Sequence, residues 1–127
     1  MLGKRELSPR RAIEAIRAAL EVGGLVPTRH SIESMALRRL DMNDVHNAIQ
    51  KGHVQNVELG KYGEYEYRVV GPPVDESSTK DLAAIIGIKT YEKSVLITCF
   101  SVESYDRPKR FAPKAQEMIP ATDRQKN

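Results

Sequence analysis

The sequence contains a single cysteine, no tryptophan and no long apolar run. Cys99 alone cannot form an internal disulfide, so we expect a reducing, cytoplasmic setting. No apolar run approaches the roughly 20 residues that a membrane span needs. The charges at residues 4–6 are not followed by the apolar core of a signal peptide. We therefore expect no membrane association and no leader.

Metal and cofactor motifs are missing as well. The three histidines, His30, His46 and His53, do not combine with Cys99 into the ligand spacing of a zinc site. The chain has no glycine-rich phosphate loop, no Gly-x-Ser-x-Gly and no His-Glu-x-x-His motif. We therefore expect no metal and no cofactor. Cys99 lies inside an apolar segment, where a buried packing role is the simplest interpretation.

The charges are unevenly spread along the 127 residues, a length that suits one domain. Residues 1–40 carry eight Lys or Arg against four Asp or Glu, and residues 104–127 carry six against three. Residues 41–103 carry six against ten, so the middle of the chain is acidic. A basic end can attract RNA, but it can equally be a solvated face or a docking surface for a protein partner.

Three helices are predicted in the first 52 residues. The first begins at Ser8, which can cap it, repeats apolar residues at the helical period, and ends at the glycine pair 23–24. The second spans about residues 29–39, and the third begins at Asp41 and ends at Gly52. The residues predicted to face inward on the second helix are Ile32, Met35 and Ala36.

The apolar period changes to two after residue 52, which indicates strands. Residues 25–28 are expected to be extended, because the residue before a proline avoids helical angles. The last two strands are the most apolar and are expected to be central, packed under the helices. Four strands are predicted, at residues 53–59, 64–70, 81–90 and 94–102.

The predicted fold class is therefore α+β, with three helices followed by a roughly four-stranded antiparallel sheet. A single domain is expected over residues 1–103. Residues 104–127 form a basic, proline-containing tail that is predicted to be partly disordered or docked on the domain. Exchange of this tail between two chains would give a homodimer.

The second helix carries a group of polar residues at helical spacing. His30 and Glu33 share one stripe, so the carboxylate could hydrogen-bond the imidazole and orient it. Arg38 follows near the end of the helix, where a cation suits the dipole. Alternatively, His30 caps the helix and Glu33 is a solvated surface carboxylate.

This helix resembles that of a widespread, uncharacterised small bacterial domain whose pattern is His-x-x-Glu-Arg-Met-x-x-Arg-Gly-Ile. By topology that family is similar to the RelE-like toxins, including MqsR and BrnT, which are small ribonucleases or translation inhibitors. The resemblance implies a RelE-like architecture over about residues 10–103. It also implies an mRNA endoribonuclease of a toxin–antitoxin system, with RNA and a cognate antitoxin as partners. The matching residues are His30-x-x-Glu33-x-Met35-x-x-Arg38, Asp44-Val45, Ile49, Gly52 and Tyr67-Arg68-Val69.

Metal-independent RNA cleavage needs a base, an acid and a cation beside the phosphorus. His30 is the candidate base or acid, Arg68 the phosphate clamp, and Tyr67 a stacking or proton-donating group. Strand alternation places Tyr67 and Arg68 on opposite faces, so without a bulge only one can enter a single cleft. A cross-strand ion pair for Arg68 and sheet packing for Tyr67 are the alternatives. The other candidates are Arg29, Arg38 and Lys61 for RNA or phosphate binding, and Glu33 for orienting His30.

A non-catalytic protein-binding module on the same scaffold is the second functional hypothesis. The chain departs from the family pattern at Arg39, where glycine is usual, and at Ser34, where arginine is usual. The acidic middle of the chain would also repel RNA phosphates. Furthermore, MqsR-type toxins use a catalytic Lys, Gln, Tyr and Lys on their strands. Aligned strand by strand, the corresponding residues here are Gln55, Tyr67, Ala84 and Ser101, and none is of the same type.

Overall fold

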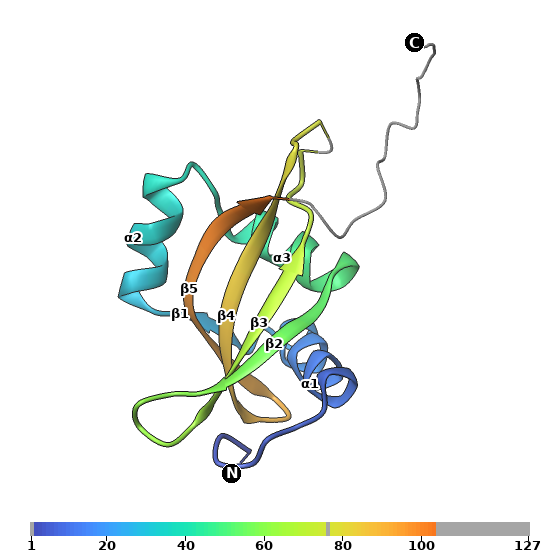
Figure 1. Ribbon diagram of the computed structural model, residues 1–127, viewed down its shortest axis with the longest axis vertical. Coiled ribbons are helices and arrows are strands. Elements are labelled where there is room, and N and C mark those ends of the chain that lie inside the picture. Colours follow the sequence, from blue (N-terminus) through green and yellow to red (C-terminus); the bar gives the residue numbers. More distant parts are fainter. Residues whose placement is uncertain (1, 76, 104–127) are drawn as a thin grey trace.

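The computed structural model describes residues 2–75 and 77–103, and these form an α+β fold with three helices and a five-stranded mixed sheet (Figure 1). The predicted tail, residues 104–127, lies outside the described residues. No helix in the described ranges combines the length and the apolar character needed to cross a membrane. The elements are α1 (Pro9–Glu21), β1 (Leu25–Pro27), α2 (Arg29–Leu37), α3 (Met42–Lys51), β2 (His53–Leu59), β3 (Tyr65–Gly71), β4 (Lys80–Thr90) and β5 (Lys93–Glu103).

The three helices begin and end close to the predicted positions, because each has a local capping signal. The Ser8 side chain accepts a hydrogen bond from the Arg11 N–H at the start of α1, and Gly23 follows the helix with a φ of 73°. Asp41 and Asp44 form a reciprocal capping box at the start of α3.

The prediction of four antiparallel strands is incomplete. The sheet order is β1-β5-β4-β3-β2, and β1 pairs with β5 in parallel, with Leu25 opposite Ser94 and Pro27 opposite Leu96. The other pairs are antiparallel. A strand of three residues is too short to show an alternating pattern, so the sequence indicated an extended segment without indicating its pairing.

The inward face predicted for α2 is also wrong in part. Met35 is buried as expected, but Ile32 is 53% exposed and Ala36 is exposed as well. The other two buried positions of the helix are Ser31 and Ser34. The reason is that α2 lies along the edge of β5 instead of on a face of the sheet (Figure 1). Thr28, the residue before α2, donates its backbone N–H to the Leu96 carbonyl at 3.0 Å.

The two faces of the sheet differ sharply. Helices α1 and α3 pack on one face, where they cover the hydrophobic core (Figure 1). No described helix lies over the opposite face, which we call the open face. Cys99 is fully buried in the core, so its interpretation as a packing residue is confirmed. Strand residues of the core include Tyr67, Val69, Leu82, Ala84, Ile86, Ile88 and Leu96.

The first prediction concerns Tyr67, whose hydroxyl joins the core to the N-terminal segment. This hydroxyl accepts the Leu7 N–H at 2.9 Å and donates to the Arg5 carbonyl at 3.3 Å. Tyr67→Phe leaves the buried Leu7 N–H without its partner. We expect the free energy of unfolding to fall by about 1–3 kcal/mol in urea titrations followed by circular dichroism. Tyr62→Phe, at an exposed ring, is the control and should cost almost nothing. Equal stability of both variants would contradict this role.

Candidate functional site

The open face contains a hollow of about 190 Å³ in which polar and apolar side chains of all four long strands meet. Arg68 is its only cation, so we call it the Arg68 hollow. Its position follows from strand register, because Arg68 pairs with Ile85, which in turn pairs with Thr98. The lining residues are Asn56, Glu58, Glu66, Arg68, Ile85, Ile97 and Thr98.

The Arg68 guanidinium lies over an aromatic ring, and no carboxylate of the described residues pairs with it. Its guanidinium carbon lies 5.1 Å from the centroid of the Phe100 ring, a cation–π distance. The Nε atom is buried and has no hydrogen-bond partner among the described residues. The predicted alternative, a cross-strand ion pair, is therefore not formed among these residues. A guanidinium that no carboxylate neutralises, in the lining of a hollow, is suited to an anion such as phosphate.

A row of side chains connects His30 with the edge of the Arg68 hollow. The His30 Nε2 lies 3.5 Å from the Ser34 Oγ, one turn further along α2. The Ser34 Oγ lies 3.2 Å from the Thr98 Oγ1, which lines the hollow. His30 itself is exposed, whereas Ser34 is buried. The row therefore runs from His30 to Thr98, and Thr98 lines the hollow together with Arg68.

Tyr67 does not reach this site. It is 1% exposed and lies on the covered face, as strand alternation from Arg68 requires. Burial raises the pKa of its hydroxyl, and the Leu7 N–H opposes this by donating to it. The hydroxyl therefore has a structural partner and no access to the Arg68 hollow.

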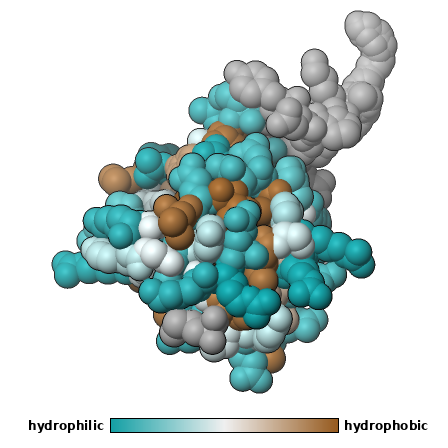
Figure 2. Space-filling view, turned by 60° about the horizontal axis from the view of Figure 1, so that its bottom comes forward, coloured by the Kyte–Doolittle hydropathy of each residue, from teal (hydrophilic) through white to brown (hydrophobic). Residues whose placement is uncertain are grey.

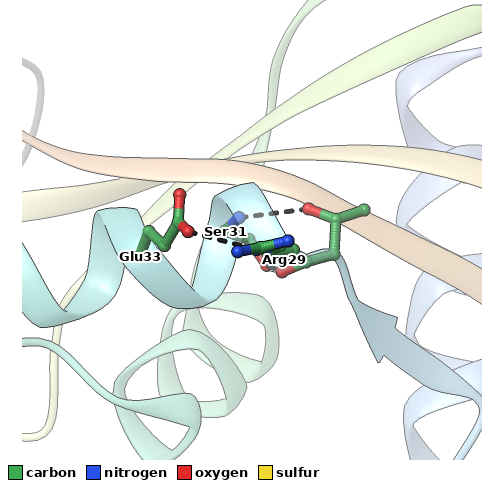
Figure 3. A network of polar contacts seen from close by, with 4 residues as sticks. Arg29, Ser31 and Glu33 are labelled. Carbon is green, nitrogen blue, oxygen red and sulfur yellow. Dashed lines mark hydrogen bonds and ion pairs between the residues drawn. The ribbon is translucent and has the colours of Figure 1, made fainter.

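Glu33 has a different partner from the predicted one. Its carboxylate lies 3.4 Å from the Arg29 Nε, and both side chains project from the outer surface of α2 (Figure 3). Exposed pairs of this kind contribute about 0.3–0.5 kcal/mol. The imidazole of His30 contacts Ser34 instead of Glu33, so the expected orienting role of Glu33 has no contact to support it.

The two remaining candidate cations lie away from the Arg68 hollow. Arg38 follows the end of α2, is exposed, and donates through Nη1 to the Ser34 carbonyl at 3.4 Å. Lys61 lies in the β2–β3 hairpin, with its Nζ 5.2 Å from the centroid of the Tyr62 ring. Neither residue lines the Arg68 hollow, so both could contact only the flanks of a ligand bound there.

Sequence reasoning missed Ser34, Thr98 and Phe100. Ser34 was noted only as a departure from the family pattern, and its contact with Thr98 spans 64 positions in the sequence. No local pattern reports such a contact. Among the described residues, no three His, Cys, Asp or Glu side chains group so that they could hold a metal ion.

The second prediction tests the support of Arg68. Phe100→Leu keeps an apolar side chain but removes the ring beneath the guanidinium. We expect the free energy of unfolding to fall by about 0.5–1 kcal/mol, with faster motion of the Arg68 Nε–H in NMR relaxation. Phe100→Tyr keeps a ring face and is the control. An Arg68 signal unchanged in the leucine variant would contradict the cation–π contact.

Comparison with known proteins identifies no relative of this chain. No family model matches it, and neither a curated protein nor a solved structure does so. The chemical interpretation of the open face therefore depends on the residues of this chain alone.

Proposed function

We propose that the open face binds RNA and cleaves it without a metal, as a RelE-like toxin would. The observation that carries this proposal is the row from His30 through Ser34 and Thr98 to the hollow that contains Arg68. This row supports the proposal because it leads from an imidazole, which can exchange a proton, to a hollow that contains a guanidinium, which can bind phosphate. An antitoxin that covers this face would neutralise the activity.

In the proposed reaction the 2′-oxygen of a ribose attacks the adjacent phosphorus. An imidazole accepts the 2′-hydroxyl proton, and the 5′-oxygen leaves with a proton from an acid, so the products are a 2′,3′-cyclic phosphate and a 5′-hydroxyl. His30 is the proposed base, and solvent is the proposed source of the second proton. Arg68, which lines the hollow, stabilises the extra negative charge on the phosphate oxygens through its guanidinium.

The third prediction compares His30→Ala and Arg68→Ala with the wild type on a defined messenger RNA without added metal. Each variant should cut at least about 100-fold more slowly, because proton transfer and charge stabilisation each contribute at least that factor. The products should carry cyclic-phosphate ends. His46→Ala is the matched control, because α3 lies on the covered face. Intact RNA beside a cooperatively folded protein would refute the proposal, as would equal rates for the two histidine variants.

A non-catalytic protein-binding module is the second candidate. The observation that favours it is the pair of carboxylates, Glu58 and Glu66, which line the same hollow as Arg68 and oppose a phosphate there. The apolar side chains of Ile85 and Ile97 would suit a protein partner. If the chain is such a module, the folded protein should leave RNA intact. His30→Ala should then lower the midpoint of unfolding, and there should be no cleavage activity for it to reduce.

A further inference from the structure

A second cavity, of about 300 Å³, lies on the open face next to the Arg68 hollow. We call it the Tyr62 cavity. It extends from the β2–β3 hairpin, at Gly60 and Tyr62, across the sheet to Val95 on β5. Glu66 and Ile97 line both depressions, so the two are direct neighbours. Figure 2 shows the hairpin end of the molecule, where apolar surface runs between hydrophilic side chains.

The Tyr62 cavity has an apolar floor and an aromatic ring at its rim. Gly87 contributes no side chain to the floor, and a methyl group placed there would lie 3.7 Å from the Ile97 Cδ1. Val95 and Ile97 supply apolar surface, and the Tyr62 ring is 81% exposed. An apolar surface beside an exposed aromatic ring is the environment that unstacked nucleobases occupy in RNA-binding proteins.

Glu66 differs from the other carboxylates of this face because its oxygens are unused. Glu64 pairs with Lys89, which holds the pKa of the Glu64 carboxyl below its ordinary value, and Glu58 accepts a hydrogen bond from the Asn56 side chain at 3.3 Å. No hydrogen bond or ion pair to Glu66 is formed among the described residues. Its Oε2 lies beside Gly60, because a methyl group on that glycine would come within 2.7 Å of it.

A free carboxylate beside an apolar slot selects among the four RNA bases. Its two oxygens each accept a hydrogen bond and cannot donate one. Guanine presents two adjacent donors, N1–H and N2–H, on its Watson–Crick edge. Adenine, cytosine and uracil each place an acceptor next to their donor on that edge, so only guanine can bind a carboxylate through two parallel hydrogen bonds.

We propose that the Tyr62 cavity binds a guanine base, with Glu66 as the residue that determines base specificity. The base rests on Gly87 and Ile97 beside the Tyr62 ring, and its edge donates to Glu66. Because Glu66 and Ile97 also line the Arg68 hollow, the phosphate of the same nucleotide occupies that hollow. This inference extends the proposed function by naming the nucleotide that the site prefers.

The fourth prediction uses 3′-GMP and 3′-AMP as probes, titrated into the full chain and followed by NMR and calorimetry, so that no cleavage is required. The wild type should prefer 3′-GMP by about 5- to 150-fold, the discrimination that one bidentate contact gives. Glu66→Gln should lose this preference, since an amide offers one acceptor and one donor. Gly87→Ala should weaken the binding of both nucleotides, because its methyl group occupies the floor of the cavity. The strand should still fold, since that methyl group lies 3.7 Å from the Ile97 Cδ1, an ordinary van der Waals distance.

Glu21→Gln, at an exposed position on α1, is the control and should bind both nucleotides as the wild type does. Equal binding of the two nucleotides by the wild type, a preference retained in Glu66→Gln, or no binding of 3′-GMP at about 10 mM would each overturn the base assignment. Binding that prefers 3′-GMP in a protein that leaves RNA intact would refute only the cleavage reaction. Cleavage without preference for guanosine would refute only the guanine site.

Discussion

The pairing of β1 with β5 determines where α2 lies, and the candidate site depends on that position. Three residues of β1 run parallel to the start of β5, and Thr28 extends the contact with two hydrogen bonds of 3.0 Å, one to Leu96 and one to Ile97. The Thr28 side chain also accepts the Ser31 N–H at the first turn of α2. One threonine therefore joins the start of the helix to the edge of the sheet, and His30 is the second residue of that helix.

The second constraint is the alternation of side chains along the strands. On β3 this alternation directs Tyr67 into the core and Arg68 to the open face. Tyr67 therefore stabilises the fold, while its neighbour Arg68 is available to the candidate site. On β5 the register shifts by one residue, because Ile85 pairs with Thr98 and Ile86 with Leu96. The extra residue, Ile97, lets Leu96 fill the core while Thr98 meets Ser34 on the other side of the sheet.

The sequence predicted what local signals encode. Capping residues located the first and third helices, and alternation located four strands and the opposite directions of Tyr67 and Arg68. The parallel pairing of β1 was not predictable, because three residues carry no period. The buried face of α2 was misjudged because this helix buries two hydroxyls that have hydrogen-bond partners: Ser31 donates to the Thr28 carbonyl, and Ser34 contacts Thr98 on β5. The candidate site is formed by contacts between distant parts of the chain, such as that of Arg68 with the Phe100 ring. No sequence motif indicates such contacts.

We propose that an RNA phosphate binds in the Arg68 hollow, which Thr98 lines at the end of the row of side chains that starts at His30. The most direct test is an NMR titration of the full chain with a short RNA made uncleavable by 2′-O-methyl groups, followed through backbone amides and arginine Nε–H signals. We expect the NMR signals of the Arg68 Nε–H, Thr98 and His30 to shift together and to saturate with one common affinity. This affinity should weaken as salt is added. Shifts confined to Arg29 on α2 and Arg38 at the end of this helix, or no shift at all, would contradict the proposal.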